Sequence, residues 1–350
     1  MMINLKNVKV SACSLLAAAI FSVAFPALAA KNVPKDVNYL LGMYYGNASV
    51  FLIRENKGNL EIVYPSDQTD RDFSHANVFP LKKVHFDSYT LNEEGPLLSA
   101  EAPVHFERDA EGNGMACKIG GKRFTRNLYP GEGHKVFRVE SQGDYQALKT
   151  AALQEAVPAK LQQGKAARLV RVRSVIPSAK VDLRYTGSNT IFGFPLHDAP
   201  DAFLDAEAAA GLQKVAEKMA GQGYGLLIWE AYRPWYVSKL ASDLLPKDKK
   251  GMLPLPDKGE DRNTGRTVDV SLYDLKTGEP VAMSSDFDEV SVRQYPAYAG
   301  GTEQQRALRD MLAADMKDAG FEQGKEEWWH FAYGKTDGWQ HLNIPYEQIK

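Results

Sequence analysis

The chain has 350 residues, of which 44% are apolar and 25% are charged, and 42 basic against 44 acidic side chains give a net charge of −2. This length favours two domains, and the composition is typical of a globular protein. A charge so close to zero provides no electrostatic footprint for nucleic acid or an anionic membrane, so we expect a small molecule or a neutral polymer as partner.

The first residues have the pattern of an export signal. Lys6 and Lys9 precede an apolar stretch at about 14–25, and Ala27-Leu28-Ala29 has the form of a cleavage site. A membrane anchor is the alternative, but the apolar stretch is short for a bilayer and ends in small residues. We therefore expect residues 1–29 to be removed, the mature protein to be periplasmic or secreted, and no stable membrane insertion after cleavage.

Residues 30–145 are predicted to form a β-rich accessory domain, because short strands alternate with glycine-containing turns. This spacing favours a small all-β barrel or sandwich. Cys117 is the one cysteine that remains after cleavage, and we expect it to be a small buried hydrophobic residue without a metal or a disulfide. The strands are expected at 49–53, 60–64, 104–108, 115–119 and 122–124.

Residues 146–167 are predicted to be a linker that contains a helix at 147–156. From 168 to 350 the pattern changes to α+β with an antiparallel sheet. Its strands are expected at 169–175, 180–185, 224–229, 268–272 and 328–333.

Two longer helices are expected in this second domain. One covers about 205–220, with its apolar residues on one face, and Gly221 is expected to cap its end. The other covers about 303–319 and begins at a capping box of Thr302 and Gln305.

Three stretches of the second domain hold residues that can carry chemistry. Arg233 follows an apolar strand and precedes a proline, so its guanidinium can stabilise an oxyanion; a structural salt bridge is the alternative. Asp269 lies in an apolar run, where a metal ion or hydrogen-bond donors must satisfy its charge. Glu327 and His330 stand three apart among aromatic residues, and a turn or bulge would bring them together. A general base beside a zinc ligand is then one interpretation, and an aromatic core with a satisfied histidine is the other.

In their order these stretches resemble the D-alanyl-D-alanine dipeptidases of the vancomycin-resistance type, a branch of the zinc D-Ala-D-Ala peptidases. The resemblance covers about 168–335 and includes 181–185, 189–193, 223–227, 283–288 and 327–330. It implies that Asp269 and His330 hold zinc. It also implies that Glu327 is the general base and that Arg233 stabilises the oxyanion. Asp288 would bind the amino group of D-Ala-D-Ala or a related dipeptide.

The chain departs from the family at one motif, S-x-H-x-x-G-x-x-x-D, which here covers residues 260–269. Glu260 stands at the serine and Arg262 at the histidine that would be the third zinc ligand. Arginine stays protonated and cannot bind a metal, and its charge would repel a dication while pairing with Asp269 and Glu327.

The third zinc ligand is therefore unknown. Asp261, Glu260 and His197 are the candidates, and for His197 a surface loop is the alternative. Two functions stay open: an exported zinc metallodipeptidase that uses metal-activated water, or a catalytically impaired relative that binds peptides or cell-wall fragments. A purely structural exported protein is a third possibility, which explains the presence of Arg233, Asp269, Glu327 and His330 least well.

Overall fold

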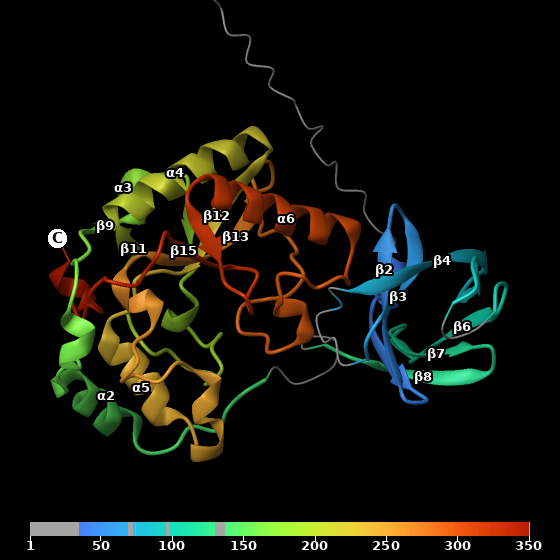
Figure 1. The fold of residues 1–350 in the computed structure, drawn as a ribbon, viewed down its shortest axis with the longest axis horizontal. Coiled ribbons are helices and arrows are strands. Elements are labelled where there is room, and N and C mark those ends of the chain that lie inside the picture. The colour runs from blue at the N-terminus through green and yellow to red at the C-terminus, as the bar shows by residue number, and fades with distance from the viewer. Residues whose placement is uncertain (1–34, 69–72, 74, 96–98, 130–136, 350) are drawn as a thin grey trace, which may run out of the picture.

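The structure, a computed structural model, describes residues 35–68, 73, 75–95, 99–129 and 137–349. The predicted export signal at 1–29 lies outside them. Figure 1 shows an all-β body beside a larger body that contains both helices and strands. None of the helices within the described ranges has both the length and the apolar character needed to cross a bilayer.

Eight strands of the described N-terminal part close into a barrel, each antiparallel to its neighbours, with β8 returning to β1. Closure leaves no sheet edge unpaired, which decides between the two architectures expected. After the short helix α1 (Lys35–Asn38), the strands are β1 (Gly42–Gly46), β2 (Ser49–Asn56), β3 (Asn59–Pro65), β4 (Ala76–His85), β5 (Ser88–Leu91), β6 (Pro103–Arg108), β7 (Gly114–Ile119) and β8 (Lys122–Asn127).

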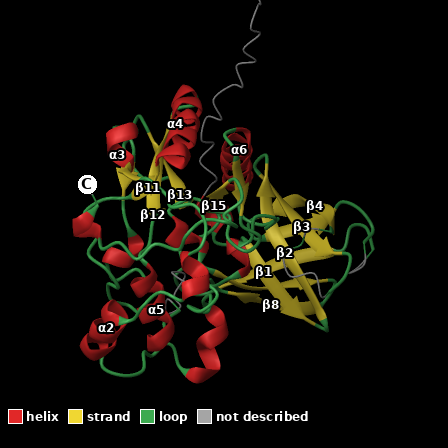
Figure 2. Cartoon of the chain, turned by 60° about the vertical axis from the view of Figure 1, so that its left-hand side comes forward, coloured by secondary structure: helices red, strands yellow, loops and turns green. Residues whose placement is uncertain are grey.

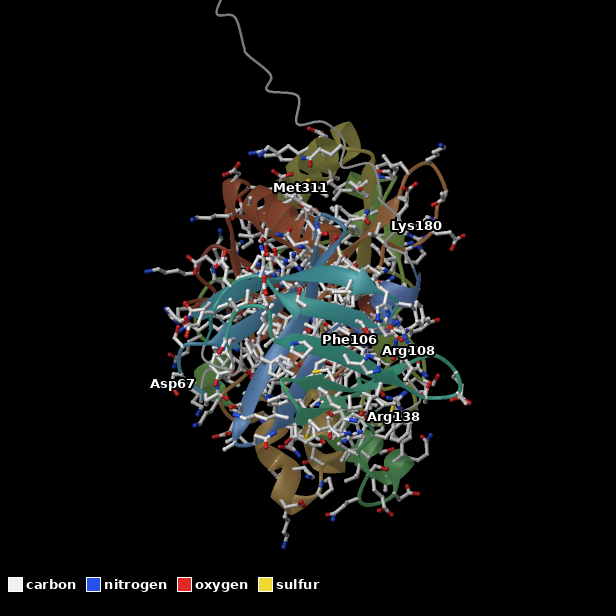
Figure 3. The ribbon with its side chains drawn as sticks, turned by 90° about the vertical axis from the view of Figure 1, so that its right-hand side faces the viewer. Asp67, Phe106, Arg108, Arg138, Lys180 and Met311 are labelled. Atoms are coloured by element: carbon white, nitrogen blue, oxygen red, sulfur yellow. The ribbon has the colours of Figure 1, made fainter. Side chains whose placement is uncertain are left out.

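Aromatic side chains fill the barrel. Phe51 packs against Phe124 edge to face at 5.1 Å between ring centroids, and Phe106 (Figure 3) contacts Tyr89 in the same way at 5.6 Å. Cys117 is fully buried among them, as predicted, and this burial raises the pKa of its thiol. The strands β4 and β5 were not predicted, because most residues of β4 face solvent and give it no apolar alternation.

The second body is built on a five-stranded sheet in the order β10-β12-β13-β15-β14. All neighbours are antiparallel except β10 and β12, which are parallel, so the sheet predicted to be antiparallel is mixed at one edge. Its strands are β10 (Lys180–Val181), β12 (Tyr224–Glu230), β13 (Thr267–Asp274), β14 (Phe321–Gln323) and β15 (His330–Tyr333), and a separate pair is formed by β9 (Leu169–Arg171) and β11 (Phe203–Asp205).

Helices α4 and α6 contact the strands β12 and β14 of this sheet. In Figure 2 these two helices lie in the upper part of the body, and α2 and α5, which pack against each other, lie in its lower part. The helix predicted at 147–156, within the segment predicted as a linker, is present as α2. The limits of the domains stay predictions. The helices are α2 (Tyr145–Gln154), α3 (Val172–Val175), α4 (Ala206–Gly221), α5 (Trp235–Leu244) and α6 (Glu303–Asp318), with 3₁₀ turns η1 (Ala159–Gln162), η2 (Arg184–Thr186), η3 (Lys247–Met252), η4 (Asp261–Thr264), η5 (Val292–Gln294) and η6 (Tyr346–Gln348).

Several boundaries differ from the sequence prediction. The strand expected at 169–175 ends at Arg171 and continues as α3, and the strand expected at 180–185 is only β10 followed by η2. Gly221 lies inside α4, and Gly223, with φ of 92°, makes the left-handed turn after the helix instead. The capping box that begins α6 is formed as predicted.

The two bodies meet between β2 and the start of α6. Glu55 is buried, and its Oε2 accepts a hydrogen bond from the backbone N–H of Glu303 at 3.0 Å. The hydroxyls of Tyr129 and Tyr298 lie 3.1 Å apart. These contacts hold the barrel beside the segment 283–303, which leads toward the pocket described below.

Candidate functional site

The register of β13 and β15 brings two of the predicted residues together. Asp269 and His330 are opposite each other on these neighbouring strands, and residues so paired share one face of the sheet. Glu327 lies in the turn before β15, where its carbonyl accepts the N–H of His330 at 3.3 Å. This turn is what allows a carboxylate three positions away to reach the same site.

Arg262 lies at the centre of this group. It belongs to η4, which ends at Gly265 in a left-handed conformation, with φ of 73°. Its guanidinium donates to both oxygens of Asp269 at 2.7–3.0 Å and to Glu327 at 3.3 Å. Asp269 is completely buried. This bidentate ion pair therefore compensates the negative charge of a carboxylate that has no access to solvent.

His330 bridges two carboxylates. Its Nδ1 lies 2.7 Å from Asp269 and its Nε2 lies 2.9 Å from Asp261. Burial and the charge of Arg262 oppose a proton on the ring, but the two carboxylates outweigh them and raise the pKa of His330 to about 9. Burial likewise opposes the charge of Asp261, and the bond from His330 outweighs it and lowers the pKa of that carboxyl to about 2.

The fit of this group to a metal ion can be tested from its donor atoms. Ligand atoms of Asp269, Glu327 and His330 all lie within 4.8 Å of one another, close enough to share a cation. In this structure the two carboxylates of the group, Asp269 and Glu327, share the guanidinium of Arg262. Both oxygens of Asp269 and both ring nitrogens of His330 already have partners. With Arg262 in this position, the residues present do not fit the zinc that the resemblance implies.

Each candidate for a third ligand already has a hydrogen-bond or ion-pair partner. Glu260 is buried and accepts from Arg262 and Arg233, each at 3.0 Å, whereas Asp261 bonds His330. His197 pairs with Glu230 at 3.5 Å. The surface position considered for His197 is wrong, because only 3% of the residue is exposed.

Arg233 is held rigidly, as expected from its place between a strand and a proline. It follows β12 and is buried over the ring of Tyr185, 4.2 Å from the ring centroid. Glu260 accepts from it at 3.0 Å, and Glu230 lies 3.4 Å away. Arg233 therefore makes the structural ion pairs of one interpretation and also lines the pocket, while its role in stabilising an oxyanion stays a prediction.

A pocket of about 420 Å³ opens beside this cluster. Asp288 is part of its wall, with φ of 50°, and the Oδ2 of Asp288 is buried without a hydrogen-bond partner in the described part of the chain. Burial and the nearby charge of Glu327 raise the pKa of Asp288 to about 7. The pocket is lined by Tyr185, Arg233, Met252, Leu253, Pro254, Glu260, Arg262, Phe287, Asp288, Gly324, Lys325, Glu326, Glu327 and His330.

The sequence analysis missed some members of this site. Glu230 ends β12 and pairs with Arg233, and the ring of Tyr185 supports the same guanidinium. Ser238, on the unpredicted helix α5, donates to Glu260 at 2.6 Å. A carboxylate three residues before a buried arginine was the one available signal, because the other contacts join segments far apart in the sequence.

Comparisons with known proteins agree on one family. Residues 165–348 match the family model described as D-ala-D-ala dipeptidase. A D-alanyl-D-alanine dipeptidase of Enterococcus faecium is 33% identical over 175 residues, which are 45% of this chain and 87% of that protein. One of Escherichia coli K12 is 26% identical over 163 residues, which are 47% of this chain and 83% of that protein. The matched part contains the whole pocket and excludes the barrel.

Proposed function

The chain belongs to the D-Ala-D-Ala dipeptidase family, and from that premise we propose that it binds a short peptide through the peptide's free amino group, with Arg262 in place of the family's zinc. D-Ala-D-Ala or a related cell-wall peptide is the ligand class. Turnover is slow or absent, because a guanidinium cannot lower the pKa of a bound water as a metal does.

The observation that carries this proposal is the pairing of Arg262 with Asp269 at 2.7 Å. It supplies the positive charge beside a buried carboxylate that a metal ion could otherwise supply. At the same time Asp288 keeps a buried oxygen without a partner in the described residues. A primary ammonium is a donor of the right charge for that oxygen, and the 420 Å³ pocket is large enough for a dipeptide.

The test is a binding measurement on protein treated with a chelator. We expect calorimetry to detect binding of D-Ala-D-Ala, no binding of its N-acetyl derivative, and no hydrolysis. Loss of binding in chelator, together with zinc-dependent hydrolysis, would contradict the proposal.

A zinc dipeptidase is the second candidate, favoured by the 4.8 Å grouping of Asp269, Glu327 and His330. It requires Arg262 to leave the cluster, and Asp261, already bonded to His330 at 2.9 Å, would replace it as the third ligand. Metal analysis after zinc supplementation tests it: about one zinc per chain, with D-Ala-D-Ala cleavage that a chelator abolishes, is the expected result.

We also propose that the protein is exported by the leader at 1–29 to the periplasm or the medium. Cell fractionation and the mass of the mature amino terminus test this. An uncleaved chain in the cytoplasm would contradict it.

A further inference from the structure

The charges around the pocket restrict the ligand further. We infer that the pocket selects peptides that carry a free amino group but whose carboxyl end is in amide linkage, and that it discriminates against free dipeptide acids. The inference rests on the proposed function, because it concerns the same pocket and the same ammonium. It concerns the opposite end of the ligand, for which the chain must provide either a cation or a neutral donor.

The positive charges of the two arginines in the pocket are already neutralised by neighbouring carboxylates. Arg233 has Glu260 at 3.0 Å and Glu230 at 3.4 Å. Arg262 has Asp269 at 2.7 Å and the same Glu260 at 3.0 Å. Because each guanidinium is compensated by two buried carboxylates, a third carboxylate from a ligand would gain little attraction.

The remaining cations do not change this balance. Even a fully charged His330 lies between two carboxylates, and Lys325 is exposed at the rim, where an ion pair contributes little. Among the described residues, four carboxylates and four cations line the pocket, and three further carboxylates, Glu230, Asp261 and Asp269, bond these cations from outside the lining. The carboxylates are Glu230, Glu260, Asp261, Asp269, Asp288, Glu326 and Glu327, and the cations are Arg233, Arg262, Lys325 and His330.

The buried polar atoms without a partner among the described residues also favour a ligand with a free amino group and an amide at its carboxyl end. The Oδ2 of Asp288 is an acceptor for an ammonium, and the buried Nε–H of Arg233 is a donor without a partner among the described residues. A peptide carbonyl can accept this hydrogen without adding negative charge beside Glu260. A terminal carboxylate beside Arg233 or Arg262 would be repelled by Glu260, Asp269 and Glu327, the three acidic groups that pair with Arg262.

The experiment compares four ligands on the full chain in chelator: D-Ala-D-Ala, its C-terminal amide, and the N-acetyl form of each. We expect the amide with a free amino group to bind at least about tenfold more tightly than the free acid, and both N-acetyl forms to bind weakly. Equal or tighter binding of the free acid, with N-acetylation still harmful, would overturn this inference and leave the proposed function intact. Absence of binding by all four would overturn the proposed function as well.

Two variants identify the groups responsible. Glu260→Gln removes one negative charge and retains the shape of the side chain, so we expect the preference for the amide to shrink. Lys325→Gln is the matched rim control, and we expect it to leave the preference unchanged; a selective loss of free-acid binding would show that Lys325 receives the carboxylate and would contradict the inference. If Glu260→Gln does not fold, the wild-type comparison decides alone.

Discussion

Replacing Arg262 by histidine exchanges the internal cation for a metal ligand. Asp269 is completely buried and accepts Arg262 through both oxygens. Removing one partner of such a buried pair costs about 3–5 kcal/mol, a large share of the roughly 5–15 kcal/mol that stabilises a domain. In chelator we therefore expect Arg262→His to have a free energy of unfolding about 3 kcal/mol or more below wild type.

Zinc is expected to reverse much of that loss, because it binds the native arrangement of Asp269, His330 and the new histidine. Free zinc at a hundred times its dissociation constant stabilises the native state by about 2.7 kcal/mol. Urea unfolding followed by tryptophan fluorescence is the assay. All five tryptophans lie in residues 229–339, so the signal reports on the dipeptidase-like domain and not on the barrel.

Arg266→His is the matched control. Arg266 is also buried and ion-paired, at 2.7 Å from Asp205 and 3.2 Å from Glu207, outside the pocket. We expect this variant to lose stability without any response to zinc. The reasoning is refuted if Arg262→His is as stable as wild type in chelator, or if zinc stabilises wild type as much as it stabilises the variant.

Three further predictions concern the charged groups. Asp288→Asn is expected to weaken binding of an amino-terminal dipeptide about tenfold; since the pKa of Asp288 is about 7, wild-type affinity measured by calorimetry should increase as the pH rises through 7, and the variant should lose this dependence. The pKa of His330 is raised from 6.5 to about 9. Its contribution to the stability of the folded protein is therefore complete below pH 6.5 and is lost as the pH rises through 9. That difference of about 2.5 pH units corresponds to about 3 kcal/mol in the free energy of unfolding, and a His330→Gln variant that keeps the full decline would contradict the assignment. Glu55→Ala leaves the N–H of Glu303 without its acceptor and is expected to cost about 1–2 kcal/mol; an unchanged thermal unfolding midpoint would show that this contact between the two bodies contributes nothing.

The sequence by itself determined the family, the two longest helices, the central strands, and the replacement of a zinc-ligand histidine by Arg262. Periodicity found the helices α4 and α6, because each buries one face, and continuous apolar runs found the central strands β12 and β13, which are buried on both faces. The motif match assigned Arg233, Asp269, Glu327 and His330 to one region of the chain. Arg262 in the histidine position was readable from residue type alone, and so was its inability to bind a metal.

Tertiary structure decided what Arg262 does. Whether the guanidinium turns outward or enters the cluster depends on the register of β13 against β15 and on Glu260, whose buried position comes from η4 and from Ser238 on α5. These contacts join segments that are distant along the chain, and no local periodicity encodes them. The charge balance of the pocket, and with it the class of ligand, exists only once the fold has brought those separate carboxylates around two arginines.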